Sequence, residues 1–131
     1  MQQKYSAILK ANNKEEKTMP FINVKTNVPA PQDKKESIKS ALGKAITAIP
    51  GKSEGWLMVG MEAEYDLWFK GSDDPAAMVE VSVYGGASAS AYSNLTAKVT
   101  DILNSELGIS PDRIYVKYFE TSNWGWNGSN F

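Results

Sequence analysis

The chain has 131 residues, of which 42% are hydrophobic and 22% are charged, and this balance suits one compact domain. Its formal net charge is -1 and Arg113 is its single arginine, so the charge pattern predicts no nucleic-acid partner. Cysteine and histidine are absent, so we expect no metal site, and any catalysis must use carboxylates, lysine, tyrosine, hydroxyl groups or a terminal amine. No stretch resembles a membrane span or a secretory signal, which predicts no membrane partner and a cytoplasmic location.

Residues 1–18 differ in character from the rest of the chain. They carry lysines and glutamates around one short apolar cluster, Tyr5–Leu9, and we expect a flexible N-terminal extension. Residues 19–131 are expected to form one domain. Its first strand is "FINVKTNV", residues 21–28, in which apolar and polar residues alternate before "PAPQD" ends the strand.

The spacing of apolar residues predicts the later elements. An amphipathic helix is expected over Asp33–Ile49, and a second helix ends at Gly108, where a left-handed cap belongs. The second helix has one apolar face, formed by Tyr92, Leu95, Val99, Ile102 and Leu103. Residues 56–69 predict a strand and then a short second strand, while residues 77–86 and 113–120 predict one strand each. The tail "NWGWNGSNF" is aromatic and rich in turn formers.

The order of these elements predicts an α+β fold made of two βαβ repeats. Because such crossovers are right-handed, both helices should cover one face of a shared four-stranded mixed sheet, giving a two-layer sandwich. The other face of the sheet would be bare. Association between subunits is the simplest way to cover it.

Four pieces of the sequence together resemble one family. They are "MPFINVKTNVP" from Met19, the pair Gly51–Lys52, "ISPDRIYVKYF" over Ile109–Phe119, and the terminal "GWNGSNF". In this order and spacing they resemble the macrophage migration inhibitory factor and D-dopachrome tautomerase family, over about residues 19–131. The resemblance implies a homotrimer and a keto–enol tautomerase without a cofactor, in which Pro20 becomes the catalytic base once Met19 is removed.

The chemistry of proline explains why Pro20 would have to be terminal. Within a chain, the nitrogen lone pair of proline is delocalised into the preceding carbonyl, so the nitrogen is a poor base. A terminal proline is a secondary amine, and burial or nearby cations lower its pKa toward neutral pH. The alternative interpretation is that Pro20 opens an edge strand, where its missing N–H is harmless.

Three further residues match substrate-binding positions of the family. Lys52 would bind the carboxylate of a 2-keto acid, and the alternative is a solvated lysine at a helix end. Tyr115 would come from the adjacent subunit, and the alternative is a core aromatic on a strand. Val83 matches a position that offers its backbone N–H to the substrate.

The rim of the pocket is predicted from aromatic residues and from one substitution. The aromatic candidates, which plain core packing would explain equally well, are Phe21, Trp56, Trp124, Trp126 and Phe131. Lys117 stands where the mammalian cytokine has an asparagine, so substrate preference could differ here. The Cys-X-X-Cys of that cytokine is replaced by "AAMV", residues 76–79, which leaves no thiol–disulfide activity.

The function expected from the resemblance is tautomerisation of phenylpyruvate-like 2-keto acids. Translation could start at Met19, residues 1–18 could be cut off, or the extension could stay and catalysis be lost; with residues 1–19 attached we expect an inactive site. The alternative function is a cytokine-like or binding protein that engages a host receptor without catalysis. The resemblance further implies secretion by a route without a signal peptide as a second location.

Overall fold

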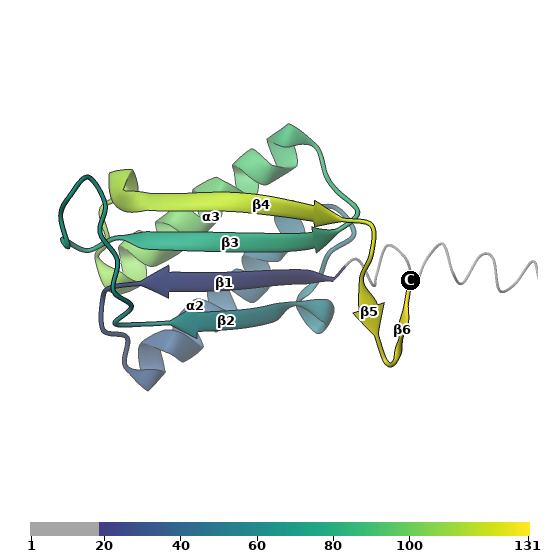
Figure 1. Cartoon of the computed structure of the whole chain (residues 1–131), viewed down its shortest axis with the longest axis horizontal. Helices are drawn as coiled ribbons and strands as arrows, with labels where there is room; N and C mark the ends of the chain where they lie inside the picture. Colours follow the sequence, from purple (N-terminus) through teal and green to yellow (C-terminus); the bar gives the residue numbers. More distant parts are fainter. Residues whose placement is uncertain (1–18) are drawn as a thin grey trace, which may run out of the picture.

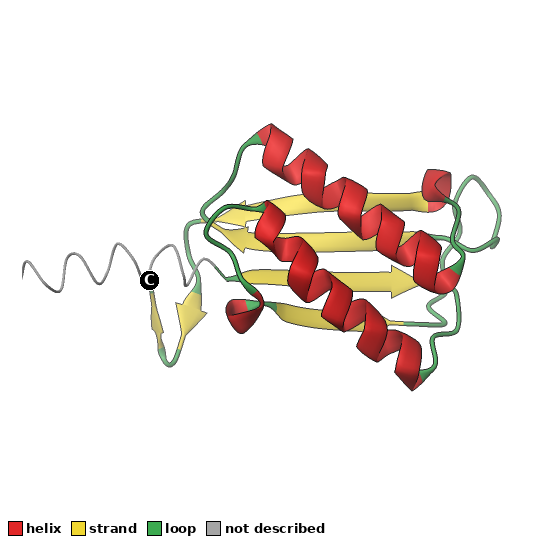
Figure 2. Cartoon of the chain, turned by 180° about the vertical axis from the view of Figure 1, so that it is seen from behind, coloured by secondary structure: helices red, strands yellow, loops and turns green. Residues whose placement is uncertain are grey.

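The sheet and its two helices form two layers. The computed structural model of the chain describes residues 19–131, and the expected extension over residues 1–18 lies outside the described residues. The strands β1 (Pro20–Thr26), β2 (Met58–Glu62), β3 (Ala77–Tyr84) and β4 (Ile114–Thr121) form one sheet in the order β2-β1-β3-β4. Helices α2 (Gln32–Ala45) and α3 (Ala89–Leu107) lie side by side on one face of it (Figures 1 and 2). The described residues contain no helix that is both long and apolar enough to cross a bilayer.

The strand directions confirm the two βαβ repeats. β1 is parallel to β2, and β3 is parallel to β4, while β1 and β3 pair antiparallel at the centre of the sheet. In the β1–β3 register Pro20 lies opposite Val83 at one end and Thr26 lies opposite Ala77 at the other. Pro20 therefore opens a central strand, and the edge-strand interpretation of this residue is wrong. The α+β class and the mixed sheet are as predicted.

The core lies between the sheet and the helices. Alternate residues of β1 and β3, such as Ile22 and Val81, are fully buried against α2 and α3. The helices contribute a matching stripe of buried side chains: Ile38, Leu42, Leu95, Val99 and Leu103. This alternation in the strands leaves the opposite face of the sheet uncovered in one chain (Figure 1).

The helix ends follow from local chemistry. α2 ends at Ala45 and continues as a 3-10 turn over Ile46–Ala48, so the predicted helix was slightly too long at its C-terminus. In α3 the Ser88 side chain accepts a hydrogen bond from the Ala91 N–H. Gly108 has a φ of 70° and its N–H donates to the Asn104 carbonyl, which confirms the predicted left-handed cap.

Two segments differ from the prediction. The short second strand expected before residue 69 does not form, because residues 63–75 make an irregular loop whose carbonyls accept hydrogen bonds from Asn27 and Arg113. The tail forms a hairpin of β5 (Gly125–Trp126) and β6 (Ser129–Asn130). Its turn residues Asn127 and Gly128 both have positive φ, as a tight two-residue hairpin turn requires.

Candidate active site

The backbone of Tyr84 connects the start of β1 with Lys52. The Tyr84 N–H donates to the Met19 carbonyl at 3.3 Å, and the Tyr84 carbonyl accepts from Lys52 Nζ at 3.4 Å. Met19 and Pro20 are both buried, and Pro20 lies opposite Val83 in the sheet. The antiparallel pairing of β1 with β3 therefore brings the Met19–Pro20 peptide and a lysine ammonium to the same backbone group.

Lys52 is a buried cation. Only 5% of the residue is exposed, and burial lowers the pKa of its ammonium group from 10.5 to about 8. The chain turns back after α2 at Gly51, whose φ of 81° favours glycine, and the Lys52 N–H donates to the Ile49 carbonyl. This turn aims the lysine inward, so the interpretation of Lys52 as a solvated helix-end residue is wrong.

The N–H groups of Val83 and Tyr84 point to opposite sides of β3. Successive N–H groups along a strand alternate in direction, and the Tyr84 N–H points toward β1, where it meets the Met19 carbonyl. The Val83 N–H consequently points toward β4. Sequence reasoning named Val83 and missed both Tyr84 and the Met19 carbonyl; the two glycines after Tyr84 mark where the strand ends, but no sequence signal sets the direction of its N–H groups.

Aromatic side chains gather beside this end of the sheet. The ring centroids of Trp56 and Trp126 are 5.1 Å apart, those of Trp126 and Phe131 are 6.4 Å apart, and those of Phe131 and Tyr84 are 5.3 Å apart. The β5–β6 hairpin holds Trp126 and Phe131 here, and the Phe131 N–H donates to the Trp124 carbonyl.

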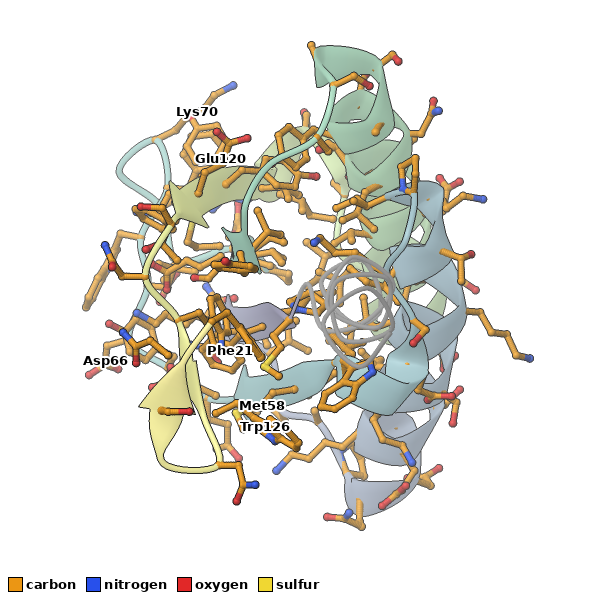
Figure 3. All side chains as sticks on the ribbon, turned by 90° about the vertical axis from the view of Figure 1, so that its right-hand side faces the viewer. Phe21, Met58, Asp66, Lys70, Glu120 and Trp126 are labelled. Carbon is orange, nitrogen blue, oxygen red and sulfur yellow. The ribbon has the colours of Figure 1, made fainter. Side chains whose placement is uncertain are left out.

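Figure 3 shows Phe21, Met58 and Trp126 at the same end of the molecule as the hairpin, and Phe21 lies opposite Met58 in the sheet. The five predicted rim aromatics are thus brought to the Pro20 end of the sheet. They come from β1, the turn before β2, and the C-terminal tail, which are far apart in the sequence.

Tyr115 and Lys117 lie elsewhere in the chain. Tyr115 pairs with Met78 near the start of β3, whereas Pro20 pairs with Val83 near its end. Tyr115 is 55% exposed, so it is not the core aromatic of the alternative interpretation. Lys117 Nζ lies 3.7 Å from a carboxylate oxygen of Glu80. One chain therefore keeps these two residues away from its own Pro20.

The site contains no evident metal-binding group. Within residues 19–131 no cluster of three or more histidine, cysteine, aspartate or glutamate side chains could hold a metal ion. What the Pro20 end does offer is a buried ammonium, a backbone N–H and an aromatic wall. Such a site can bind a small carboxylate that bears an apolar group.

Comparisons with known proteins identify the family of the chain. The sequence model described as macrophage migration inhibitory factor (MIF) matches residues 19–131. The chain belongs to the macrophage migration inhibitory factor family. Among curated relatives, macrophage migration inhibitory factor of Meriones unguiculatus is 36% identical, with 86% of this chain and 99% of that protein covered. The Mus musculus protein is 31% identical over the same shares.

Solved structures agree with this assignment. The crystal structure of Leishmania major MIF2 has a TM-score of 0.82 and 32% identity, covering 87% of this chain and 98% of that one. Macrophage migration inhibitory factor of Toxoplasma gondii has a TM-score of 0.79 and 25% identity, covering 85% and 99%. Membership of this family, which lies in the tautomerase superfamily, supports a tautomerase or cytokine-like function and in general an isomerase activity.

Proposed function

We propose that this protein is a cofactor-independent keto–enol tautomerase of phenylpyruvate-like 2-keto acids, with Pro20 as the catalytic base. The observation that carries the proposal is the Tyr84 backbone, which holds the Met19 carbonyl on one side and Lys52 Nζ on the other. When Met19 is gone, Pro20 becomes a secondary amine in a buried setting. The Tyr84 N–H then loses its present acceptor and is available to a substrate oxygen.

The proton transfer needs no outside reactant. The Pro20 amine takes the hydroxyl proton of the enol, and the resulting ammonium gives a proton to C3. The O–H bond breaks, a C3–H bond forms, and the C=C double bond becomes C=O. The Lys52 ammonium and the Tyr84 N–H bind the carboxylate, and their charge-assisted hydrogen bonds orient C3 toward Pro20.

The complete site needs a neighbouring subunit. In this proposal the protein is a homotrimer, like other members of its family, and Tyr115 and Lys117 of one subunit stand at Pro20 of the next. Their place at the opposite end of the sheet from Pro20 supports this arrangement. The aromatic rim of the Pro20 end then faces Tyr115 across the interface. We also propose a cytoplasmic location, with secretion that uses no signal peptide.

Residues 1–19 block the base in this account. While Met19 is attached, the Pro20 nitrogen is an amide and cannot accept the proton. We therefore propose that residues 1–18 form a separate extension and that residues 19–131 form the tautomerase domain. The chain that carries the extension should fold and bind but not turn over.

Three forms of the protein test the role of Pro20: the full chain, a chain that begins at Met19, and a chain that begins at Pro20. We expect the Pro20 form to tautomerise enol-phenylpyruvate about a hundredfold or more faster than the other two, because a positioned general base contributes on this scale. The Met19 form is the matched control, since it differs by one residue. Equal rates for the Met19 and Pro20 forms would show that another group is the base.

A second variant checks the nature of the amine. In the Pro20 form, Pro20→Gly should lose most of the turnover, because it replaces a ring-held secondary amine by a flexible primary one. If no form turns over arylpyruvates, the cytokine-like or receptor-binding function remains.

A further inference from the structure

We infer that the apolar cavity beside Tyr115 binds the aryl ring of the substrate, and that Trp68 sets the preference for aryl over small alkyl 2-keto acids. The inference rests on the proposed function, because it needs Tyr115 of one subunit to stand at Pro20 of the next. The cavity lies where residues 67–69 of the loop meet the first residues of β3 and β4, at the left-hand end of the sheet in Figure 1.

The cavity has the size and the lining that a phenyl ring requires. Its volume is about 180 Å³, and its walls come from Leu67, Trp68, Phe69, Met78, Arg113 and Tyr115, with two alanines. An apolar cavity of about 150 Å³ inside a protein is large enough to take up benzene. A phenyl group therefore fits, whereas a methyl or ethyl group would leave most of the space empty.

The loop that carries Trp68 is held in place by two side chains. Arg113 donates to the carbonyls of Phe69, Ser72, Asp74 and Pro75 at 2.9 to 3.2 Å. Asn27 donates to the carbonyls of Leu67, Asp73 and Asp74 at 3.0 to 3.1 Å and accepts from the Ala76 N–H at 2.9 Å. The loop is thus fixed by backbone contacts before any ligand arrives, and a preformed wall loses little entropy on binding.

Trp68 is the wall residue that the rest of the cavity leaves open. Phe69 packs on Tyr115 with a ring distance of 4.8 Å and lies 5.2 Å from the Arg113 guanidinium, so it is fixed inside the chain. Trp68 remains 65% exposed on the rigid loop. A large aromatic side chain presented next to Tyr115 gives a substrate ring an apolar surface to stack on.

The test compares two substrates in the chain that begins at Pro20. Hydrogen–deuterium exchange at C3 is followed for phenylpyruvate and for 2-ketobutyrate, with kcat and KM determined for each. Trp68→Ala should lower kcat/KM for phenylpyruvate about three- to tenfold, through KM, because it removes an aromatic contact. Exchange of 2-ketobutyrate should stay unchanged, and Trp68→Phe should fall between the two proteins.

Tyr65→Ala is the matched control, since Tyr65 is an exposed aromatic of the same loop that does not line this cavity. It should change neither substrate. Equal losses for both substrates in Trp68→Ala, or no loss, would overturn the inference. Dissociation of the trimer by Trp68→Ala with an unchanged substrate ratio would mean that a neighbouring subunit fills the cavity. If the unsubstituted chain exchanges neither substrate, the proposed function fails and this inference fails with it.

Discussion

Lys52 is a charged group in a place where its charge is disfavoured. Burial lowers the pKa of its ammonium to about 8, so a carboxylate ligand meets a cation only below that pH. We predict that phenylacetate, a non-reacting carboxylate, binds the Pro20 form progressively more weakly as pH rises through about 8. Isothermal titration between pH 6.5 and 10 measures this.

Lys52→Arg separates this effect from the titration of Pro20, because a guanidinium keeps its charge over the whole range. The arginine variant should retain its affinity above pH 9. Affinity of the unsubstituted chain that is constant from pH 7 to 10 would show that Lys52 does not bind the carboxylate.

The same pKa predicts how stability depends on pH. Between about 8 and 10.5 the unfolded chain binds more protons at this lysine than the folded chain does, so the free energy of unfolding should rise with pH across this window. Burial and Glu120 raise the pKa of Tyr92 to about 12, which has the opposite sign and acts only above about pH 10. Urea unfolding at pH 8 and pH 10 should therefore show a gain that Lys52→Met lacks; an equal gain in both proteins would contradict the assignment.

At the scale of elements, the loop over residues 63–75 depends on Arg113. We predict that Arg113→Ala lowers the free energy of unfolding by about 1–3 kcal/mol, because four carbonyls lose a charged donor. Arg113→Lys should restore only part of it, since an ammonium cannot reproduce the guanidinium fork. Urea unfolding and amide exchange of the loop measure both effects, with exposed Lys98→Ala as the control. Full recovery in Arg113→Lys would contradict the geometric role.

How far the sequence predicts these elements depends on whether their pattern is local. The alternation in β1 and β3 and the apolar stripe of α3 come from neighbouring residues, and the structure has them nearly as predicted. The loop after β2 could not be predicted, because its shape is set by Asn27 and Arg113, which lie far away in the sequence. For the site, the position of Tyr84 could not be predicted either, since only strand pairing decides that its N–H faces Met19.

At the scale of the whole molecule, the uncovered face of the sheet predicts association. Met58, Tyr115 and Phe119 of the strands are 67%, 55% and 48% exposed, and Lys25 and Lys117 both contact Glu80 between them. Exposed apolar side chains next to such ion pairs are typical of a surface that another subunit covers. Sedimentation of the full chain should give about three times 14.4 kDa. A monomer at micromolar concentration would contradict the shared site.

The measurement that tests the central claim most directly is the intact mass of the natural, active protein. The proposed proton transfer needs a free proline nitrogen, so the active species should begin at Pro20 and lack residues 1–19. Its pH–rate profile should then report a base with a pKa below that of an ordinary secondary amine. Natural material that retains Met19 and still turns over arylpyruvates at the full rate would contradict the assignment of Pro20 as the base.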